Sequence, residues 1–426
     1  MEIKKGYKMT DVGVIPEDWE VKSIGEMYSF KNGLNKDKDS FGFGTPIINY
    51  MDVYKNNGLT SKCIKGKVSL SDYEISYFLV KKGDVFFTRT SETPEEVGIA
   101  SVLLDELPKG VFSGFLLRAR PDGNDIEPLL CKYIFTTESF RSSVIQNSTY
   151  TTRALTNGAI LSSLYVAFPK SIVEQQSIAD ALTKIDNLIT SLTKVIEKKK
   201  MIKKGAMQKL LSGEMRLDGF EGEFATKTFS DFIERFATGL NPRDNFELNK
   251  GGNNYYVTIK NFINGKLFLD DNCDKITDEA IDIIDKRSSL KVGDVLFSSI
   301  GRIGDAYVIN ENPTNWNINE SVFALRPNPT IMDSFFLYYL IKSDSVQKKF
   351  DDAISGSTLK SIKLNDLKEI ECTYPQNIDE QTAIANILTT MDNEIEALEK
   401  ERDKYKCIKQ GMMQQLLTGK IRLTCQ

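Results

Sequence analysis

The feature that most constrains this chain is an internal repeat. Residues 174–217 align with residues 380–423 without a gap, at an offset of 206 residues, and 23 of the 44 aligned positions are identical. Self-similarity at a fixed spacing is the mark of a duplicated structural unit. Any fold for this chain must therefore contain two copies of the repeated segment, separated by the length of one domain.

Each copy of the repeat predicts one long α-helix. Apolar residues recur in alternating steps of four and three, which is typical of a coiled-coil seam. A helix from about residue 174 to 211 would be about 57 Å long. Both copies end in Leu-Leu-Ser/Thr-Gly, and Gly213 and Gly419 suit a left-handed C-terminal cap. The seam residues are Ile178, Leu182, Ile185, Ile189, Leu192 and Ile196 in the first copy and Ile384, Leu388, Met391, Ile395 and Leu398 in the second.

The seam is interrupted at Lys199 in the first copy and at Arg402 in the second, which indicates a stutter or a change of partner. The simplest way to satisfy both seams within one chain is an antiparallel pair with approximate two-fold symmetry. Beyond the interruption we expect the apolar step to resume through Ile202, Ala206 and Leu210, and through Ile408, Met412 and Leu416.

The segments before the two helices also correspond, although more faintly. Gly-Asp-Val runs at residues 83–85 and 293–295 predict turns that feed a β-strand, and the Asn-Gly pairs at 57–58 and 264–265 predict tight turns. The predicted fold class is α+β: two mixed α/β domains alternate with two long helices that pack as an antiparallel coiled coil. The expected parts are residues 1–170, 171–213, 214–375 and 376–420.

The residue inventory excludes several classes of enzyme. The chain has no histidine, which removes Ser-His and Cys-His nucleophile pairs and every histidine-ligated metal site. No Gly-Lys pair is followed by the Ser or Thr of a phosphate-binding P-loop. The glycine-rich run at residues 41–45 favours a turn or a substrate-facing loop over a cofactor loop. The six cysteines are far apart and predict reduced thiols. We therefore expect no catalytic residues, no metal site and no cofactor bound by this chain.

Polar loops at equivalent places in the two copies are the candidate ligand sites. They combine hydroxyl and amide groups with basic residues just beyond a strand or turn, which suits contacts to phosphates and to base edges. Their occurrence in both copies favours a shared kind of ligand over ordinary solvated turns. The candidates are Asn35, Lys36, Lys38, Thr88, Arg89, Ser91, Tyr150, Thr152 and Arg153 in the first copy and Arg243, Asn245, Ser298, Ser299, Arg302, Ser357, Thr358 and Lys360 in the second.

The charge balance limits how such loops could bind DNA. The chain has 55 basic and 59 acidic residues, and residues 218–375 alone carry 18 basic and 25 acidic side chains. Any affinity for DNA must therefore come from local patches, and we expect weak binding by the isolated chain. No window approaches 18 uninterrupted apolar residues, so we expect a cytoplasmic protein.

The chain as a whole resembles the specificity subunits of type I restriction-modification enzymes. The resemblance rests on the opening Gly-Val-Ile-Pro-Glu-Asp-Trp at residues 13–19, on the Glu-Gln pairs at 174–175 and 380–381 shortly after a proline, and on the helix endings. The sequence departs from that pattern at the start of the second domain, where Phe-Ala-Thr-Lys at 224–227 replaces the tryptophan-containing opening.

This resemblance implies a non-catalytic reader of double-stranded DNA. Each globular domain would be a target recognition domain for one half of an asymmetric bipartite sequence, read in the major groove. The helices would set the separation of the two readers, about one duplex turn or 34 Å. The implied partners are two methyltransferase subunits, which bring S-adenosylmethionine, and two restriction/translocase subunits, which use ATP and Mg²⁺.

Two questions stay open at this level. Apolar residues at the helix ends either dock partner subunits or are buried against the chain's own domains; these are Met207, Leu211, Met413 and Leu417. The alternative function is a coiled-coil scaffold whose globular domains bind proteins instead of DNA.

Overall fold

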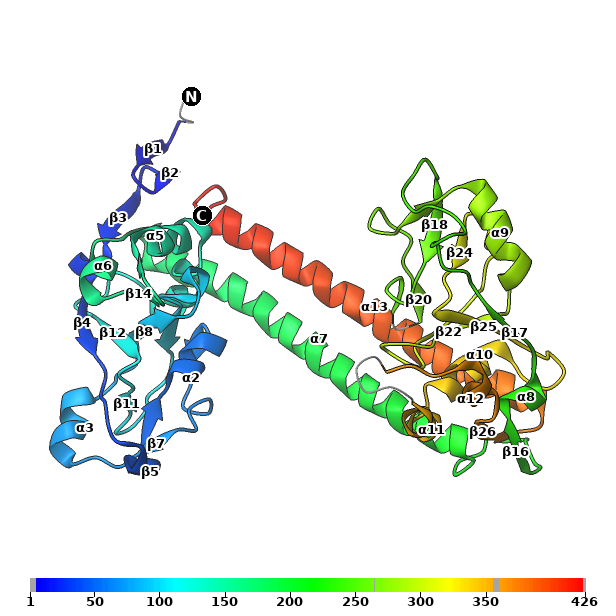
Figure 1. Ribbon diagram of the computed structural model, residues 1–426. Helices are drawn as coiled ribbons and strands as arrows, with labels where there is room; N and C mark the ends of the chain where they lie inside the picture. Colours follow the sequence, from blue (N-terminus) through cyan, green and yellow to red (C-terminus); the bar gives the residue numbers. More distant parts are fainter. Residues whose placement is uncertain (1–4, 264, 355–359, 424–426) are drawn as a thin grey trace. The chain divides into compact units, whose positions relative to one another are not determined.

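The computed structural model describes residues 5–263, 265–354 and 360–423, which form two compact units. Unit 1 combines Met1–Thr193 with Lys400–Gln426, and unit 2 consists of Lys194–Glu399. Each unit therefore contains one globular domain, the beginning of the long helix that follows this domain, and the end of the other long helix (Figure 1).

The first globular domain, in unit 1, is built on a five-stranded sheet of order β4-β12-β8-β10-β6. All of its pairings are antiparallel except that of β10 with β6. A second sheet, β11-β5-β7, contains one parallel and one antiparallel pairing. The elements are β1 (Tyr7–Thr10), β2 (Gly13–Pro16), β3 (Trp19–Ser23), α1 (Ile24–Met27), β4 (Tyr28–Asn32), η1 (Lys38–Ser40), β5 (Phe41–Ile48), α2 (Tyr50–Lys55), β6 (Gly58–Leu59), β7 (Lys67–Val68), α3 (Asp72–Phe78), β8 (Val85–Thr88), β9 (Thr90–Ser91), η2 (Pro94–Glu96), β10 (Ala100–Leu103), β11 (Val111–Phe112), β12 (Leu116–Pro121), α4 (Pro128–Ile134), α5 (Glu138–Asn147), β13 (Thr149–Tyr150), β14 (Ala154–Leu155), α6 (Gly158–Ser162) and β15 (Tyr165–Pro169).

The second globular domain, in unit 2, repeats this plan with fewer strands. Its main sheet has the order β17-β25-β22-β23, which corresponds to β4-β12-β8-β10. The parallel pairing of β18 with β24 corresponds to that of β5 with β11. The elements are β16 (Phe224–Thr228), α8 (Phe229–Phe232), β17 (Ile233–Thr238), β18 (Asn254–Val257), β19 (Phe262–Ile263), β20 (Lys266–Leu267), β21 (Lys275–Ile276), α9 (Asp278–Ser288), β22 (Val295–Ser298), β23 (Ala306–Val308), β24 (Trp316–Ile318), β25 (Val322–Pro327), α10 (Ser334–Ile341), α11 (Asp344–Ala353), α12 (Leu364–Lys368) and β26 (Glu371–Pro375).

The central strand of each main sheet is buried along its whole length. All four residues of β8, Val-Phe-Phe-Thr, and all four of β22, Val-Leu-Phe-Ser, are inaccessible to solvent. Continuous apolar runs of this kind are typical of strands that are covered on both faces. The Gly-Asp turns before them adopt the predicted conformation, with φ of +89° at Gly83 and +91° at Gly293.

The two long helices are α7 (Ile172–Ser212) and α13 (Ile378–Leu416). Gly213 and Gly419 follow their last turns with φ of +77° and +69°, which confirms the predicted left-handed caps. Ion pairs between the helices show that their segments run antiparallel within each unit. They join Asp186 to Lys409 in unit 1, and Lys199 to Glu394 and Lys203 to Asp392 in unit 2.

The predicted apolar stripe is buried over the first part of each helix, and beyond the interruption it is wrong only at its first position. Leu210 and Leu416 are buried as expected, and Ala206 and Met412 pack against the same cores. Ile178 and Leu182 are fully buried, and so is Leu388 in the second helix. By contrast, the side chain of Ile202 is 52% exposed and that of Ile408 is 39% exposed. The next residues, Lys203 and Lys409, face the partner helix instead and pair with its aspartates. The apolar pattern misled here because a lysine can lay its methylene stem along the interface and present its charge to a carboxylate.

One of the two predicted Asn-Gly turns is also wrong. Gly58 begins strand β6 and pairs in parallel with β10, where a side chain would meet Leu104 at 2.8 Å. In unit 2, strands β19 and β20 form the expected hairpin, with φ of +76° at Gly265. Asn264 lies outside the described residues.

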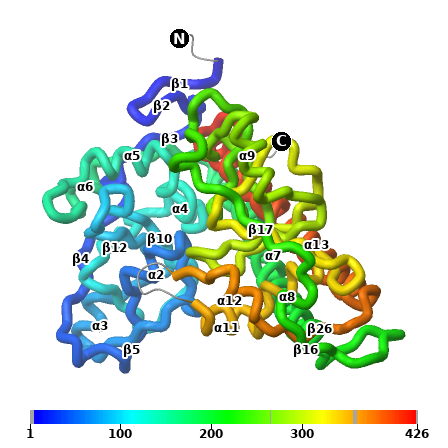
Figure 2. Tube along the Cα trace, turned by 45° about the vertical axis from the view of Figure 1, so that its right-hand side comes forward, coloured from blue at the N-terminus to red at the C-terminus, as the bar shows by residue number. Residues whose placement is uncertain are grey.

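A strand pair closes each domain next to its helix. In unit 1, Trp19 of β3 is paired with Pro169 of β15, and in unit 2, Phe224 of β16 is paired with Pro375 of β26. Figure 2 shows β16 and β26 side by side. Phe224 therefore takes the place of Trp19 in the ladder, despite the different sequence. The β1–β2 hairpin precedes this pair in unit 1.

Candidate nucleic-acid interface

The polar loops predicted in the first domain lie together. Strands β13, β14 and β9 form a small sheet that joins residues 149–155 to residues 90–91. The amide of Thr156 donates to the carbonyl of Arg89 at 2.9 Å. Two stretches that are some 60 positions apart in the sequence thus form one surface.

The third predicted loop, which contains Asn35, reaches the same surface through Gly114. The amide of Gly114 donates to the carbonyl of Leu34 at 2.7 Å, and the Arg89 guanidinium donates to the carbonyl of Gly114 at 3.4 Å. A Cβ at Gly114 would lie 2.0 Å from Oδ1 of Asn35, so a side chain there would displace the Asn35 amide. We call residues 34–38, 88–91, 113–115 and 149–156 the first loop cluster.

Most of the predicted side chains in the first loop cluster are accessible. Asn35, Lys36, Lys38, Thr152 and Arg153 are exposed, and so is Tyr150, while Arg89 is half-buried.

Lys36 is exposed but paired. Its ammonium lies 2.7 Å from a carboxylate oxygen of Glu74, and the hydrogen bond from Lys36 lowers the pKa of Glu74 to about 2. Lys36 would therefore have to exchange this partner for a phosphate if it contacts DNA.

Two predicted hydroxyls in this cluster face inward. Thr88 is fully buried, and its hydroxyl donates to the carbonyl of Glu96 and accepts the amide of Ile99. Ser91 is 6% exposed and donates to the carboxylate of Glu96 at 3.1 Å. Both side chains hold the loop together, and their role as DNA contacts stays a prediction.

The second domain assembles its loops in a corresponding way. The amide of Ser299 donates to the carbonyl of Ser321 at 3.0 Å, and the amide of Ile362 donates to the carbonyl of Ser299 at 2.9 Å. Ile300 and Ser361 form an isolated antiparallel bridge. We call residues 239–245, 298–302, 319–321 and 360–362 the second loop cluster. Two predicted residues of this loop, Ser357 and Thr358, lie outside the described residues.

The two clusters share a hydrogen-bond frame but carry different side chains. The hydrogen bonds that Arg89 makes with Phe115 and Thr156 are made by Ser299 with Ser321 and Ile362. The counterpart of Arg89 is therefore Ser299, and not Arg302 as the sequence pattern suggested.

Ser298 and Ser299 are buried, and their hydroxyls donate to carbonyls of Ile300 and Ser321 at 2.8 Å. Like Thr88 and Ser91, they remain untested as DNA contacts.

The charged residues of the second loop cluster are exposed. Arg302 is 51% exposed, pairs with Asp305 at 3.0 Å and donates to the carbonyl of Ile259 at 3.1 Å. Lys360 is exposed next to it, because its carbonyl accepts the amide of Gly301 at 3.4 Å.

Arg243 and Asn245 lie on an exposed loop that follows Leu240. The carbonyl of Leu240 accepts the hydroxyl of Tyr256 at 2.7 Å, and burial raises the pKa of Tyr256 above its usual value. This phenol therefore stays a hydrogen-bond donor and anchors the start of the loop.

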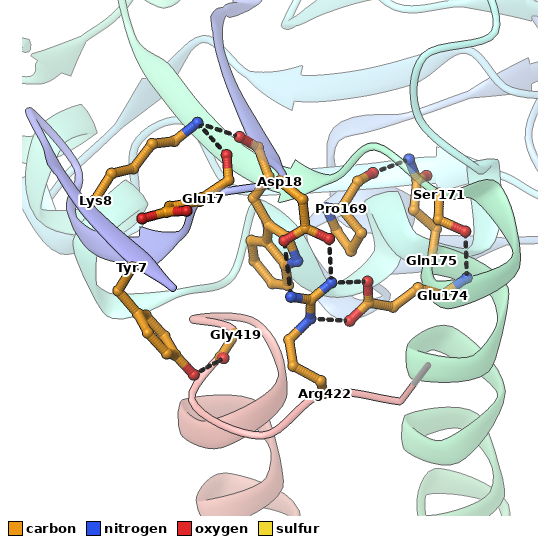
Figure 3. A network of polar contacts seen from close by, with 11 residues as sticks. Tyr7, Lys8, Glu17, Asp18, Pro169, Ser171, Glu174, Gln175, Gly419 and Arg422 are labelled. Carbon is orange, nitrogen blue, oxygen red and sulfur yellow. Dashed lines mark hydrogen bonds and ion pairs between the residues drawn. The ribbon is translucent and has the colours of Figure 1, made fainter. Parts of the chain in front are cut away.

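The Glu-Gln pair at the start of each helix joins that helix to its own domain. The side-chain amide of Gln175 donates to the carbonyls of Pro169 and Asp125, both at 2.8 Å (Figure 3 shows the Pro169 bond). Gln381 donates to Pro375 at 2.8 Å and to Ile331 at 2.9 Å. These glutamines are fully buried, so each helix leaves its domain at a fixed place.

An arginine beyond the end of each helix pairs with the glutamate at the start of the other. Arg422 donates two hydrogen bonds to Glu174 at 2.6 and 2.7 Å, and two more to Asp18 at 2.8 and 2.7 Å (Figure 3). Arg216 donates two to Glu380 at 2.7 and 2.8 Å. We call these pairs the helix clasps. The repeat contained all four residues, but only the structure shows that each clasp joins one copy to the other.

Further along the helices, an aspartate in each unit binds a lysine of the partner helix and a tyrosine of the domain. Asp186 is 2.6 Å from Lys409 and 2.8 Å from Lys132, and it accepts the hydroxyl of Tyr133 at 2.9 Å. Burial alone would raise the pKa of Asp186, but the hydrogen bonds from the two lysines outweigh it and lower that pKa.

In unit 2, the corresponding aspartate is Asp392. It binds Lys203 at 2.5 Å and Tyr339 at 2.9 Å. The three residues stand at the same offset of 206 from Asp186, Lys409 and Tyr133. The same side-chain network therefore ties helix, helix and domain together in both units.

The apolar residues at the helix ends pack against the chain's own domains. Leu417 is buried in the core that contains Trp19, and Leu211 in the core that contains Phe297. Met413 and Met207 are partly buried against the same two cores. Of the two readings left open by the sequence, the structure supports burial. Among the described residues, no helix is long and apolar enough to cross a membrane.

The sequence matches the family model for the type I restriction modification DNA specificity domain twice, at residues 16–203 and 221–404. A Methanocaldococcus jannaschii protein named as the MjaVIII type I restriction enzyme specificity subunit is 26% identical over 96% of this chain and 94% of its own length. The crystal structure of a type I restriction-modification system S subunit from M. genitalium has a TM-score of 0.58 at 15% identity, and the match covers 98% of each chain.

A third similar chain comes from a study of complex assembly and conformational transition of the type I restriction-modification system. It has a TM-score of 0.54 at 16% identity and covers 96% of this chain and 99% of its own. The two structural likenesses show that the fold is shared. The duplicated domain, the paired helices and the double match of the family model together establish that this chain belongs to the type I restriction-modification DNA specificity family, as a non-catalytic subunit with two target recognition domains.

Proposed function

We propose that this chain selects the target sequence of a type I restriction-modification complex by reading an asymmetric bipartite site in double-stranded DNA. The first loop cluster would read one half of the target and the second loop cluster the other. The observation that carries this proposal is the shared hydrogen-bond frame with different side chains, in which Arg89 and Phe115 correspond to Ser299 and Ser321. A shared frame suits a shared kind of ligand, and different side chains suit different bases.

The accessible members of the two clusters supply the contacts. Arginine reads guanine edges with two hydrogen bonds and asparagine reads adenine edges, while lysine mainly neutralises phosphates. The buried serines and Thr88 would shape the loops. The proposed contacts are Asn35, Lys36, Lys38, Arg89, Tyr150, Thr152, Arg153, Arg243, Asn245, Arg302 and Lys360.

The assembly that we propose around this chain contains two methyltransferase subunits and two restriction/translocase subunits. S-adenosylmethionine, ATP and Mg²⁺ would be bound by those partners in the cytoplasm. Residues 218–375 carry seven more acidic than basic side chains, 25 against 18, so partner subunits would supply much of the phosphate neutralisation. The long helices would set the separation of the half-sites and dock the methyltransferases.

The test is DNA binding by the complex of this chain with its methyltransferase. Arg89→Ala should weaken discrimination at one half-site by about tenfold, and Arg302→Ala should do so at the other, because each removes one contact to a base edge. Lys82→Ala and Lys286→Ala serve as controls, since both lysines are exposed and lie outside the clusters. An equal loss at both half-sites from either arginine variant would contradict the assignment of one cluster to each half.

The alternative is a scaffold whose globular domains bind proteins. In that case the chain would show no sequence-dependent DNA binding, with or without the arginines, and it would purify without a methyltransferase.

A further inference from the structure

Phe115 is an apolar side chain at the centre of the first loop cluster. Its side chain is 62% exposed, although the following residues Leu116 and Leu117 are buried in strand β12. The chain shields its other central phenylalanines, such as Phe86 and Phe87, completely. An exposed ring among polar loops needs a ligand with an apolar part if it is to be covered on binding.

The backbone that carries Phe115 is fixed on both sides. Its carbonyl accepts the amide of Arg89 at 3.1 Å, and its amide donates to the hydroxyl of Ser113 at 3.4 Å. The preceding Gly114 lies against the amide group of Asn35, which a side chain at position 114 would displace. The backbone position from which the ring projects is therefore set before a ligand arrives, and binding would require little reorganisation of the backbone.

The neighbours of Phe115 carry polar groups that suit purines. The guanidinium of Arg89 and the amide of Asn35 both contact Gly114, the residue next to Phe115. In the major groove, arginine matches guanine, asparagine matches adenine, and an apolar side chain matches the C5-methyl group of thymine. A phenylalanine beside these two side chains therefore completes a set that can distinguish a thymine from a cytosine.

The second loop cluster has no equivalent of this ring. The carbonyl that accepts the amide of Ser299 belongs to Ser321, which occupies the position of Phe115. Phe268 and Phe335 are exposed phenylalanines of unit 2, but Phe268 follows strand β20 and Phe335 lies in helix α10, so neither belongs to the second loop cluster. The apolar reader is thus a feature of the first cluster.

We propose that Phe115 recognises the methyl group of a thymine in the half-site that unit 1 reads, next to the base pair contacted by Arg89. This inference rests on the proposed function and deepens it by assigning one base type to one residue. It requires at least one A·T pair in that half-site. The other half-site has no such requirement, because Ser321 stands in the place of Phe115 in the second loop cluster.

The test uses the complex of this chain with its methyltransferase and DNA duplexes in which each thymine is replaced in turn by uracil, which lacks only the methyl group. With the native chain, one uracil in the first half-site should weaken binding by about fourfold, the value of one buried methyl group. Phe115→Ser places at this position the residue type that the second loop cluster has at Ser321. This variant should bind the duplex with that uracil as tightly as the duplex with thymine. Phe115→Leu should keep the discrimination, because leucine is still apolar.

Phe43→Ala is the matched control. Phe43 lies in the same domain and is 58% exposed, but it belongs to strand β5, outside the cluster. This variant should respond to uracil as the native chain does. A uracil effect that persists unchanged in Phe115→Ser would overturn the inference, as would a first half-site without any A·T pair.

Two other results separate this inference from the proposed function. If 2-aminopurine next to the site brightened on binding and lost this response in Phe115→Ser, the ring would act as a wedge between bases and the methyl assignment would be wrong. If the chain conferred no sequence-dependent binding at all, the proposed function itself would fail.

Discussion

The two helix clasps perform the same task with different surroundings. Arg422 binds the buried Glu174 and also Asp18, which lies next to the fully buried Trp19. Arg216 binds the buried Glu380, but its third hydrogen bond goes to the carbonyl of Gly222, and its guanidinium lies 5.1 Å from the ring of Phe224. The duplication thus kept the contact between helix end and helix start, while the flanking contact diverged with the domain opening.

The comparison teaches which part of the repeat is structural. Residues that join the two helices kept their identity in both copies because each needs the other copy as its partner. The clasp glutamates are 2% and 1% exposed, and a buried carboxylate without its arginine is strongly unfavourable. The side chains of the loop clusters are not paired with the other copy of the repeat, so these residues were free to diverge between the two domains.

The largest expected effect comes from removing the arginines. Arg422→Ala should lower the free energy of unfolding by about 4 kcal/mol, since it leaves a buried glutamate unpaired and also frees Asp18. Arg216→Ala should cost about 3 kcal/mol, because only the glutamate loses its partner. Urea unfolding of the whole chain measures both. A smaller loss for Arg422→Ala than for Arg216→Ala would show that Asp18 contributes nothing to the first clasp.

Substitutions at the two helix caps should also destabilise unit 1 more than unit 2. An alanine Cβ at Gly419 would lie 2.5 Å from Pro16, whereas at Gly213 it would lie 3.1 Å from the ring of Phe224, and both positions have positive φ. Gly419→Ala should therefore cost about 3 kcal/mol and Gly213→Ala about 1 kcal/mol. Thermal unfolding of the two variants would test this order, and Gly205→Ala is a control at an open helical position.

The smallest effect concerns pH. The hydrogen bond from Arg422 lowers the pKa of Asp18 below its ordinary 3.8. A lowered pKa stabilises the folded chain above pH 3.8, and this contribution disappears as the pH falls through the folded value. Native protein should therefore lose part of its advantage over Asp18→Asn between pH 5 and about 3. Unfolding midpoints of the two proteins across this pH range measure the effect, and parallel midpoints throughout would contradict it.

Much of the fold could be predicted from the sequence because the duplication is direct. The offset of 206 residues located both helices, and the glycines after them marked their ends. The first position beyond the interruption could not be predicted, because the apolar Ile202 and Ile408 looked like better interface residues than the neighbouring lysines that take their place. Lys203 and Lys409 face the partner helix because Asp392 and Asp186 stand opposite them, and the sequence alone does not show which residues stand opposite.

The positions of the loop clusters could be predicted from the sequence, but the orientation and the correspondence of their side chains could not. Sequence similarity placed Arg89 and Ser298 just beyond corresponding strands, but it could not tell that Ser298 faces inward or that Ser299 is the counterpart of Arg89. Phe115 was missed because an apolar residue before a strand resembles a core residue. The available signal was the glycine before it, together with the serine at the same offset in the second copy.

The central claim is that this chain directs a methyltransferase to one asymmetric bipartite DNA sequence. Long-read methylation sequencing of cells that carry its methyltransferase, with and without this chain, tests it most directly. We predict one bipartite methylated motif, with two different half-sites, that is present only when the chain is present. A methylation pattern that is the same in both cells would contradict the account.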